Sequence, residues 1–300
     1  MFPSFLCRKN DMNGKECFLI STSHLSDRIL FRNDDDFKAA MNIVAIAAFM
    51  TGITILDFVL MSNHVHFVVL GDYDTALKFV NLFKSLYALY AKNQHGIDKL
   101  FRKNEVDIRA IPFENESLER VLAYVQANPV AANICPHPSL YQWGCGQLLF
   151  NTMPLSGRKQ LREYSFRAQT RILHSNVRLP QDYVLSADGY IVPSSYVPVN
   201  YVEGIFRTAK RYNFFLINSS KARARMEDTP MPSFRDQVID QAISDLCHSL
   251  YRKERVSDLC PPELGELLRQ IRRRFNADIA QLARITGIPY SEISSSLDSF

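Results

Sequence analysis

The sequence predicts an α+β protein whose first half is built on an antiparallel sheet. Three observations predict it: short apolar strand-like runs, longer segments with apolar residues at helical spacing, and their alternation along the first 130 residues. The chain of 300 residues is 47% hydrophobic and 22% charged, so it can bury a full core and divide into more than one domain. Its net charge of +4 agrees with a polyanionic partner without establishing one.

The apolar stretch from Met41 to Met61 is about as long as a bilayer crossing. Polar residues interrupt it, among them Asp57, and β-branched residues concentrate only after Gly52. We therefore interpret the stretch as the end of a helix, a glycine turn and a buried strand. No membrane association is expected.

Two histidines one residue apart occupy the next strand, in the run HVHFVVL over residues 64–70. Successive side chains of a strand point to opposite faces, so His64 and His66 project from the same face, close enough to share a divalent ion. With seven histidines in the chain, the spacing alone is weak. Two half-buried, hydrogen-bonded imidazoles are the alternative interpretation.

A later helix offers two further side chains. Residues 117–129 carry apolar side chains at helical spacing, and Tyr124 and Asn128 stand four residues apart, one above the other. Pro129 disfavours helical geometry at Asn128, which predicts that the pair lies in the last turn. Such a helix can aim a phenol and an amide oxygen at one target.

Taken in order, the expected elements give the arrangement β-α-β-β-α-β-α. This order is typical of a ferredoxin-like fold, an antiparallel sheet with helices on one face. The expected strands span residues 16–22, 53–60, 64–70 and 106–112, and the expected helices span residues 35–50, 74–93 and 117–128.

The motifs around these residues resemble those of the REP-associated tyrosine transposases, which belong to the HUH single-tyrosine transposases. The resemblance rests on the run VLMSNHVH, which ends at His66, and on the run YVQANPV, which starts at Tyr124. Shorter similarities at residues 29–37, 100–102 and 141–143 extend it over about residues 15–146, with the motifs in the family's order.

The resemblance implies a transposase, an endonuclease and strand transferase for single-stranded DNA that carries a hairpin. In that family's chemistry Tyr124 is the nucleophile and stays joined to the 5′ side of the cut, while His64, His66 and Asn128 are metal ligands. The implied cofactor is Mg²⁺ or Mn²⁺. A phenol is a weak nucleophile at neutral pH, so a cation on the phosphate supplies much of the catalysis. The family contains monomers and homodimers that exchange tyrosine helices, which leaves the oligomeric state open.

Basic residues mark the expected DNA contacts, because phosphate binding needs positive charge more than fixed geometry. A solvated surface is the alternative interpretation for each of them. The expected contacts are Arg102, Lys103 and Arg109 before the tyrosine helix, Arg207, Lys210 and Arg211 in an expected helix over residues 199–215, and Arg272, Arg273 and Arg274 near the C-terminus.

Three regions are expected: the catalytic domain over residues 1–150, a basic middle region of unknown fold over 151–232, and a mostly helical region over 233–300. The last region is similar to a helix-turn-helix, with a helix from Asp278, a turn at Gly287 and a second helix whose start can enter a major groove. This pattern favours duplex DNA as a second partner.

The six cysteines form no C-x-x-C pair and no signal peptide opens the sequence, so we expect reduced cysteines in a cytoplasmic protein. Two alternatives to the transposase remain open. One is a DNA-binding protein with the same fold that does not cut. The other is a relaxase or replication initiator of related HUH chemistry.

Overall fold

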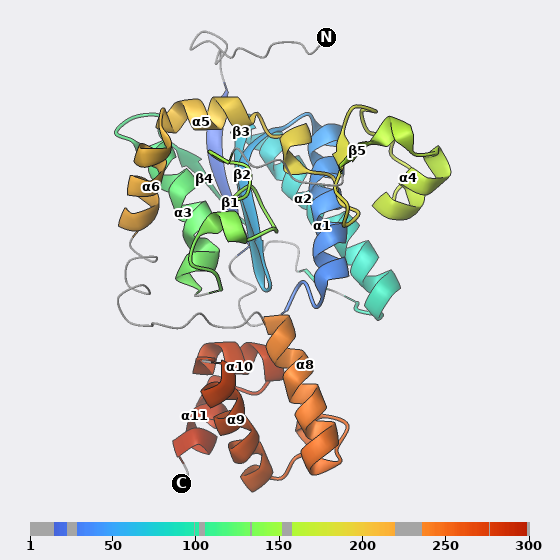
Figure 1. The fold of residues 1–300 in the computed structure, drawn as a ribbon, viewed down its shortest axis with the longest axis vertical. Helices are drawn as coiled ribbons and strands as arrows, with labels where there is room; N and C mark the ends of the chain where they lie inside the picture. Colours follow the sequence, from blue (N-terminus) through green and yellow to red (C-terminus); the bar gives the residue numbers. More distant parts are fainter. Residues whose placement is uncertain are drawn as a thin grey trace.

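The computed structural model describes residues 15–22, 29–98, 100–101, 106–132, 134–151, 158–219, 236–275 and 277–298. Its N-terminal part is a sheet with helices packed on it, and its C-terminal part is a bundle of helices (Figure 1). The predicted α+β class is confirmed.

The main sheet has four strands in the order β2-β3-β1-β4, and every neighbouring pair is antiparallel. A bulge between Ile55 and Asp57 shifts the register of the β2–β3 hairpin. Each strand lies within two residues of its predicted position. The strands are β1 (Glu16–Ser21), β2 (Thr54–Met61), β3 (His64–Gly71) and β4 (Asp107–Ile111).

Local capping sets both ends of the first helix. The Asn33 side chain accepts a hydrogen bond from the Asp36 N–H, and Gly52 ends the helix with a φ of 70°. The predicted glycine turn before β2 is thus confirmed, and no helix among the described residues is long and apolar enough to span a membrane. The sheet-associated helices are α1 (Asp34–Thr51), α2 (Tyr73–His95) and α3 (Ser117–Ala131).

Helices cover both faces of the sheet, so the prediction of helices on one face is wrong. Phe67 of β3 packs on Phe79 and Phe83 of α2, with ring centroids 5.0 and 5.3 Å apart. Its neighbour His66 points to the opposite face, where it meets Tyr124 of α3. Residues 65–71 are all buried. A strand that is apolar on both sides needs cover on both sides, which explains the second layer.

The outer edge of β2 is covered by the segment around Gly144. The Leu60 N–H donates to the Trp143 carbonyl (2.9 Å) and the Cys145 N–H donates to the Phe58 carbonyl (3.1 Å). A Cβ on Gly144 would lie 2.5 Å from the Phe58 oxygen, so only glycine permits this approach. The segment therefore occupies the edge of β2 at residues 58–60.

The middle region packs on the sheet region. Asn42 of α1 donates to the carbonyls of Ile172 and Gly189 and accepts from the Ile191 N–H. The single helix predicted over residues 199–215 is two helices, because the backbone turns at Arg207 with a φ of 67°. The elements are β5 (Lys159–Gln160), α4 (Phe166–Leu173), β6 (Val184–Leu185), α5 (Val199–Phe206) and α6 (Ala209–Asn218).

The C-terminal bundle has its own core, in which Ile239, Leu267, Ile271 and Leu282 are buried. Gly287, with a φ of 72°, separates the last two helices as predicted. The bundle contains α8 (Asp236–Leu246), a π-helical turn (Cys247–Tyr251), α9 (Pro261–Phe275), α10 (Ile279–Thr286) and α11 (Tyr290–Asp298).

Candidate active site

The two histidines of β3 lie beside one another on the sheet face that α3 covers. Their ring centroids are 4.9 Å apart and the rings are nearly perpendicular. His66 is buried, with 3% of its surface exposed, and His64 is half-buried at the start of the strand. The shared face that the strand alternation predicts is present.

Asn63 orients the first imidazole. Its Oδ1 lies 2.8 Å from Nδ1 of His64. An amide oxygen only accepts hydrogen bonds, so this contact favours the tautomer of His64 that carries its proton on Nδ1, in which Nε2 is the nitrogen with a lone pair for a metal. Metal-binding histidines are held in this way by an outer hydrogen bond on the other ring nitrogen.

Tyr124 of α3 lies against the histidine pair. Its ring centroid is 5.7 Å from that of His66, with the rings at 72°. Two distant parts of the sequence, a strand and a helix, thus bring a phenol and two imidazoles together. All three side chains belong to one copy of the chain.

Strand register adds Arg109 to the same face. His66 pairs with Ser21 of β1, and Ser21 pairs with Asp107 of β4. Directly paired residues share a face, and Arg109 follows Asp107 by two residues. The Arg109 guanidinium donates to Asp107 (2.6 Å), which raises the pKa of Arg109, and Tyr124 adds a smaller electrostatic contribution. An exposed cation therefore stands near the phenol.

Asn128 lies one helical turn beyond Tyr124, but Pro129 does not end the helix as predicted. Pro129 lacks the N–H that the Val125 carbonyl needs, and α3 continues to Ala131. The Asn128 amide nitrogen donates instead to Val125 O (3.2 Å) and to Tyr124 O (2.8 Å). This side chain replaces the missing backbone donor, and its Oδ1 is the atom that remains for a ligand.

A buried carboxyl that sequence reasoning did not assign lies between α3 and β2. Gln126 Nε2 donates to Oδ1 of Asp57, which has no exposed surface. Burial raises the pKa of Asp57 to about 8, while Gln126 opposes the shift. The sequence signal that could have identified Asp57 is a single acidic residue inside an otherwise apolar strand. The contact holds α3 on the sheet two residues from Tyr124.

Among the described basic residues of the prediction, Arg109 lies on the histidine face, and the others lie on α6, at the α5–α6 junction and on α9. Arg211 binds Glu116 (2.8 Å) and Glu119 (3.4 Å), so its charge ties α6 to the start of α3. The side chains of four others are exposed, two at the α5–α6 junction and two on α9: Arg207, Lys210, Arg272 and Arg274. Arg102, Lys103 and the Arg273 side chain lie outside the described residues.

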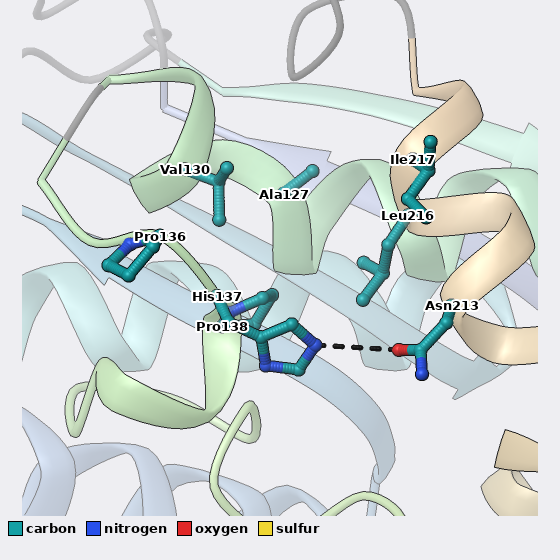
Figure 2. A pocket seen from close by; sticks show the side chains of 8 residues that line it. All are labelled: Ala127, Val130, Pro136, His137, Pro138, Asn213, Leu216 and Ile217. Carbon is teal, nitrogen blue, oxygen red and sulfur yellow. Dashed lines mark hydrogen bonds between the residues drawn. The ribbon is translucent and has the colours of Figure 1, made fainter. Parts of the chain in front are cut away.

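A separate apolar pocket lies beside α3, and neither His64 nor His66 lines it. Figure 2 shows it between α3, α6 and the 3₁₀ turn Pro138–Leu140, where His137 faces Asn213 at 3.4 Å. Its volume is about 320 Å³. Ala127, Val130 and Leu216 are among its lining residues, and none of the candidate catalytic side chains lines it.

The donors that the structure brings together at the site are the imidazoles of His64 and His66, with the Tyr124 ring against them. Among the described residues no group of three or more His, Cys, Asp or Glu side chains is placed to hold a metal. Comparison with family models, with curated proteins and with solved structures finds no match to this chain.

Proposed function

We propose that this protein is a metal-dependent endonuclease and strand transferase for single-stranded DNA, of the HUH tyrosine transposase type. The observation that carries the proposal is the position of the Tyr124 ring, 5.7 Å from His66, which in turn lies 4.9 Å from His64. A buried and a half-buried histidine on one sheet face, beside a phenol, have the parts for metal-assisted covalent attack on a phosphate.

The strand order supports the proposed ferredoxin-like HUH domain. β1 and β3 are the central strands, α1 connects β1 to β2, and α2 connects β3 to β4. This is the split β-α-β arrangement, with α3 added on the second face. The proposed fold therefore places the histidine strand in the centre of the sheet.

In the proposed reaction the Tyr124 oxygen attacks the phosphorus of a DNA phosphodiester. The bond from phosphorus to the 3′ oxygen breaks, the phenol proton is released, and the departing oxygen takes a proton to become a 3′-hydroxyl. The 5′ side stays joined to Tyr124. The ester keeps the energy of the broken linkage, so attack by a 3′-hydroxyl reverses the step and rejoins DNA.

His64 Nε2, His66 and Asn128 Oδ1 would hold the divalent cation, and Arg109 would contact a neighbouring phosphate. When bound, Mg²⁺ or Mn²⁺ draws charge from the non-bridging phosphate oxygens. Two imidazoles suit Mn²⁺ better than Mg²⁺, which prefers an all-oxygen shell. We therefore expect activity with both ions and tighter binding of Mn²⁺.

We propose duplex DNA as a partner of the C-terminal bundle. Residues 290–298 of α11 contain no lysine or arginine, whereas Arg272 and Arg274 are exposed on α9. Phosphate contacts would therefore come from α9 rather than from α11.

The deciding experiment uses labelled single-stranded oligonucleotides with a hairpin stem and randomised flanks, analysed on denaturing gels. Wild-type protein with Mg²⁺ or Mn²⁺ should give a covalent adduct that chelator prevents. Tyr124→Phe should give none, because it lacks only the attacking oxygen. Tyr73→Phe, at an exposed tyrosine of α2, is the matched control and should behave as wild type.

Adduct formation by Tyr124→Phe would refute the assignment of the nucleophile. Hairpin binding without cleavage, unchanged in His64→Ala and His66→Ala, would instead favour the non-cleaving DNA-binding protein.

A further inference from the structure

The C-terminal bundle reaches the turn that carries the histidine pair through one buried carboxylate. Asp236, the first residue of α8, has 2% of its surface exposed. Ser62, in the turn between β2 and β3, donates its hydroxyl to Asp236 Oδ2 at 2.6 Å. The two residues are 174 positions apart in the sequence.

The other partners of this carboxylate come from α10. Arg284 donates through Nε to Oδ2 (2.7 Å) and through Nη2 to Oδ1 (2.9 Å), and Gln281 Nε2 donates to Oδ1 (2.9 Å). Burial alone would raise the pKa of Asp236, but Arg284 and the neutral donors outweigh it and lower the pKa. The group is therefore a charged, fully hydrogen-bonded carboxylate at neutral pH.

Further hydrogen bonds hold the turn between β2 and β3 and the segment before α1. The Ser62 carbonyl accepts the N–H groups of Leu30 (2.7 Å) and Phe31 (3.1 Å), and Gln237 Nε2 donates to the Phe31 carbonyl. The start of α8 thus binds two adjoining segments of the sheet domain, which is the main sheet β1–β4 with the helices and the middle region packed on it. These bonds restrict the backbone of the turn at Ser62.

Asn63 follows Ser62 directly, and its Oδ1 is the atom that orients His64. A shift of the turn would move this oxygen. The hydrogen bond that sets the tautomer and the orientation of the His64 imidazole would then change. Outer hydrogen-bond partners of this kind change metal affinity by about tenfold or more. The bundle therefore has a direct route of contacts to a candidate metal ligand.

We propose that Asp236 is a positioning residue for the metal site, so that the bundle completes the catalytic unit by holding the Ser62–Asn63 turn. The proposal rests on the proposed function, because it assigns a role to His64 as a ligand.

The test uses the full chain and Ser62→Ala, which removes the bridging hydroxyl while leaving the Asp236–Arg284 pair in place. Asp236→Asn is the second variant, and Glu266→Gln, at an exposed ion pair on α9, is the control. Mn²⁺ affinity is measured without DNA by electron paramagnetic resonance. Amide hydrogen exchange of Leu30 and Phe31, which donate to Ser62, reports the order of the turn.

Ser62→Ala and Asp236→Asn should weaken Mn²⁺ binding about tenfold and speed exchange at both amides, whereas Glu266→Gln should change neither. Unchanged Mn²⁺ affinity and exchange in a folded Ser62→Ala protein would overturn the proposal. If wild type neither binds Mn²⁺ nor forms an adduct, the proposed function fails. In that case, faster amide exchange in the two variants would still show that Asp236 orders the turn at Ser62. Unchanged amide exchange would overturn this part of the proposal too.

Discussion

The sheet domain and the C-terminal bundle differ in where their candidate functional groups lie. In the sheet domain His66, Asp57 and Asn128 are buried between β-strands and α3. In the bundle the candidate DNA contacts Arg272 and Arg274 are exposed on one helix. A polar group inside a core is costly unless it has partners, so it stands out in an apolar sequence. An exposed arginine needs no partner, and its sequence context says little about its role.

The two regions also have separate apolar cores, joined at the described boundary by polar contacts to Asp236 and Gln237. Polar contacts of this type resemble a domain interface more than a shared core. We therefore expect each region to unfold with its own stability.

The largest expected effects come from removing one core side chain in each region. Phe67→Ala should destabilise the sheet domain by about 3–5 kcal/mol and Ile271→Ala the bundle by about 2–5 kcal/mol. Trp143, the single tryptophan, is buried in the sheet domain, so its fluorescence follows that domain alone. In urea, Ile271→Ala should shift the circular dichroism transition and leave the fluorescence midpoint in place.

If Ile271→Ala moves both signals together, the chain is one cooperative unit and the comparison of two regions fails.

A second effect concerns the buried carboxyl of the sheet domain. The pKa of Asp57 is about 8 in the folded protein, above the ordinary value of 3.8, so folding retains a proton that the unfolded chain releases. The free energy of unfolding should therefore fall as pH rises from about 4 to 8, by up to about 1.4 kcal/mol per pH unit. Urea titrations at several pH values measure this slope.

Asp57→Asn cannot ionise and should remove that contribution to the slope, whereas Asp98→Asn at an exposed ion pair should keep it. The same slope in Asp57→Asn and wild type would show that the carboxyl is already ionised in the folded protein.

The smallest expected effect separates two roles of Asn128. Asn128→Ala should cost about 1–2 kcal/mol, because the Val125 carbonyl loses its donor. Pro129→Ala restores a backbone N–H for that carbonyl, so the double variant should recover most of the stability. Thermal unfolding measures this recovery of stability. A DNA cleavage assay reports the second role of Asn128, as a metal ligand.

If Asn128 is also a metal ligand, the double variant should regain stability and remain deficient in cleavage. Recovery of both properties would limit Asn128 to the helix.

Much of the first domain could be predicted because its signals are local. Gly52 ends α1 as expected, and the strands lie close to their predicted bounds. The break at Arg207 was missed because a positive φ at a non-glycine residue leaves no mark in the apolar spacing. The continuation of α3 through Pro129 was missed because a side-chain donor replaced the backbone one.

The sequence by itself determined the shared face of His64 and His66, since alternation along a strand follows from backbone geometry. It also determined the helical spacing of Tyr124 and Asn128. Only the tertiary structure decided that α3 lies on the histidine face, because that depends on which side of the sheet is left uncovered by α1 and α2. The contact of Asp236 with Ser62 likewise depends on folding, because hydrogen bonds between residues 174 positions apart have no local pattern.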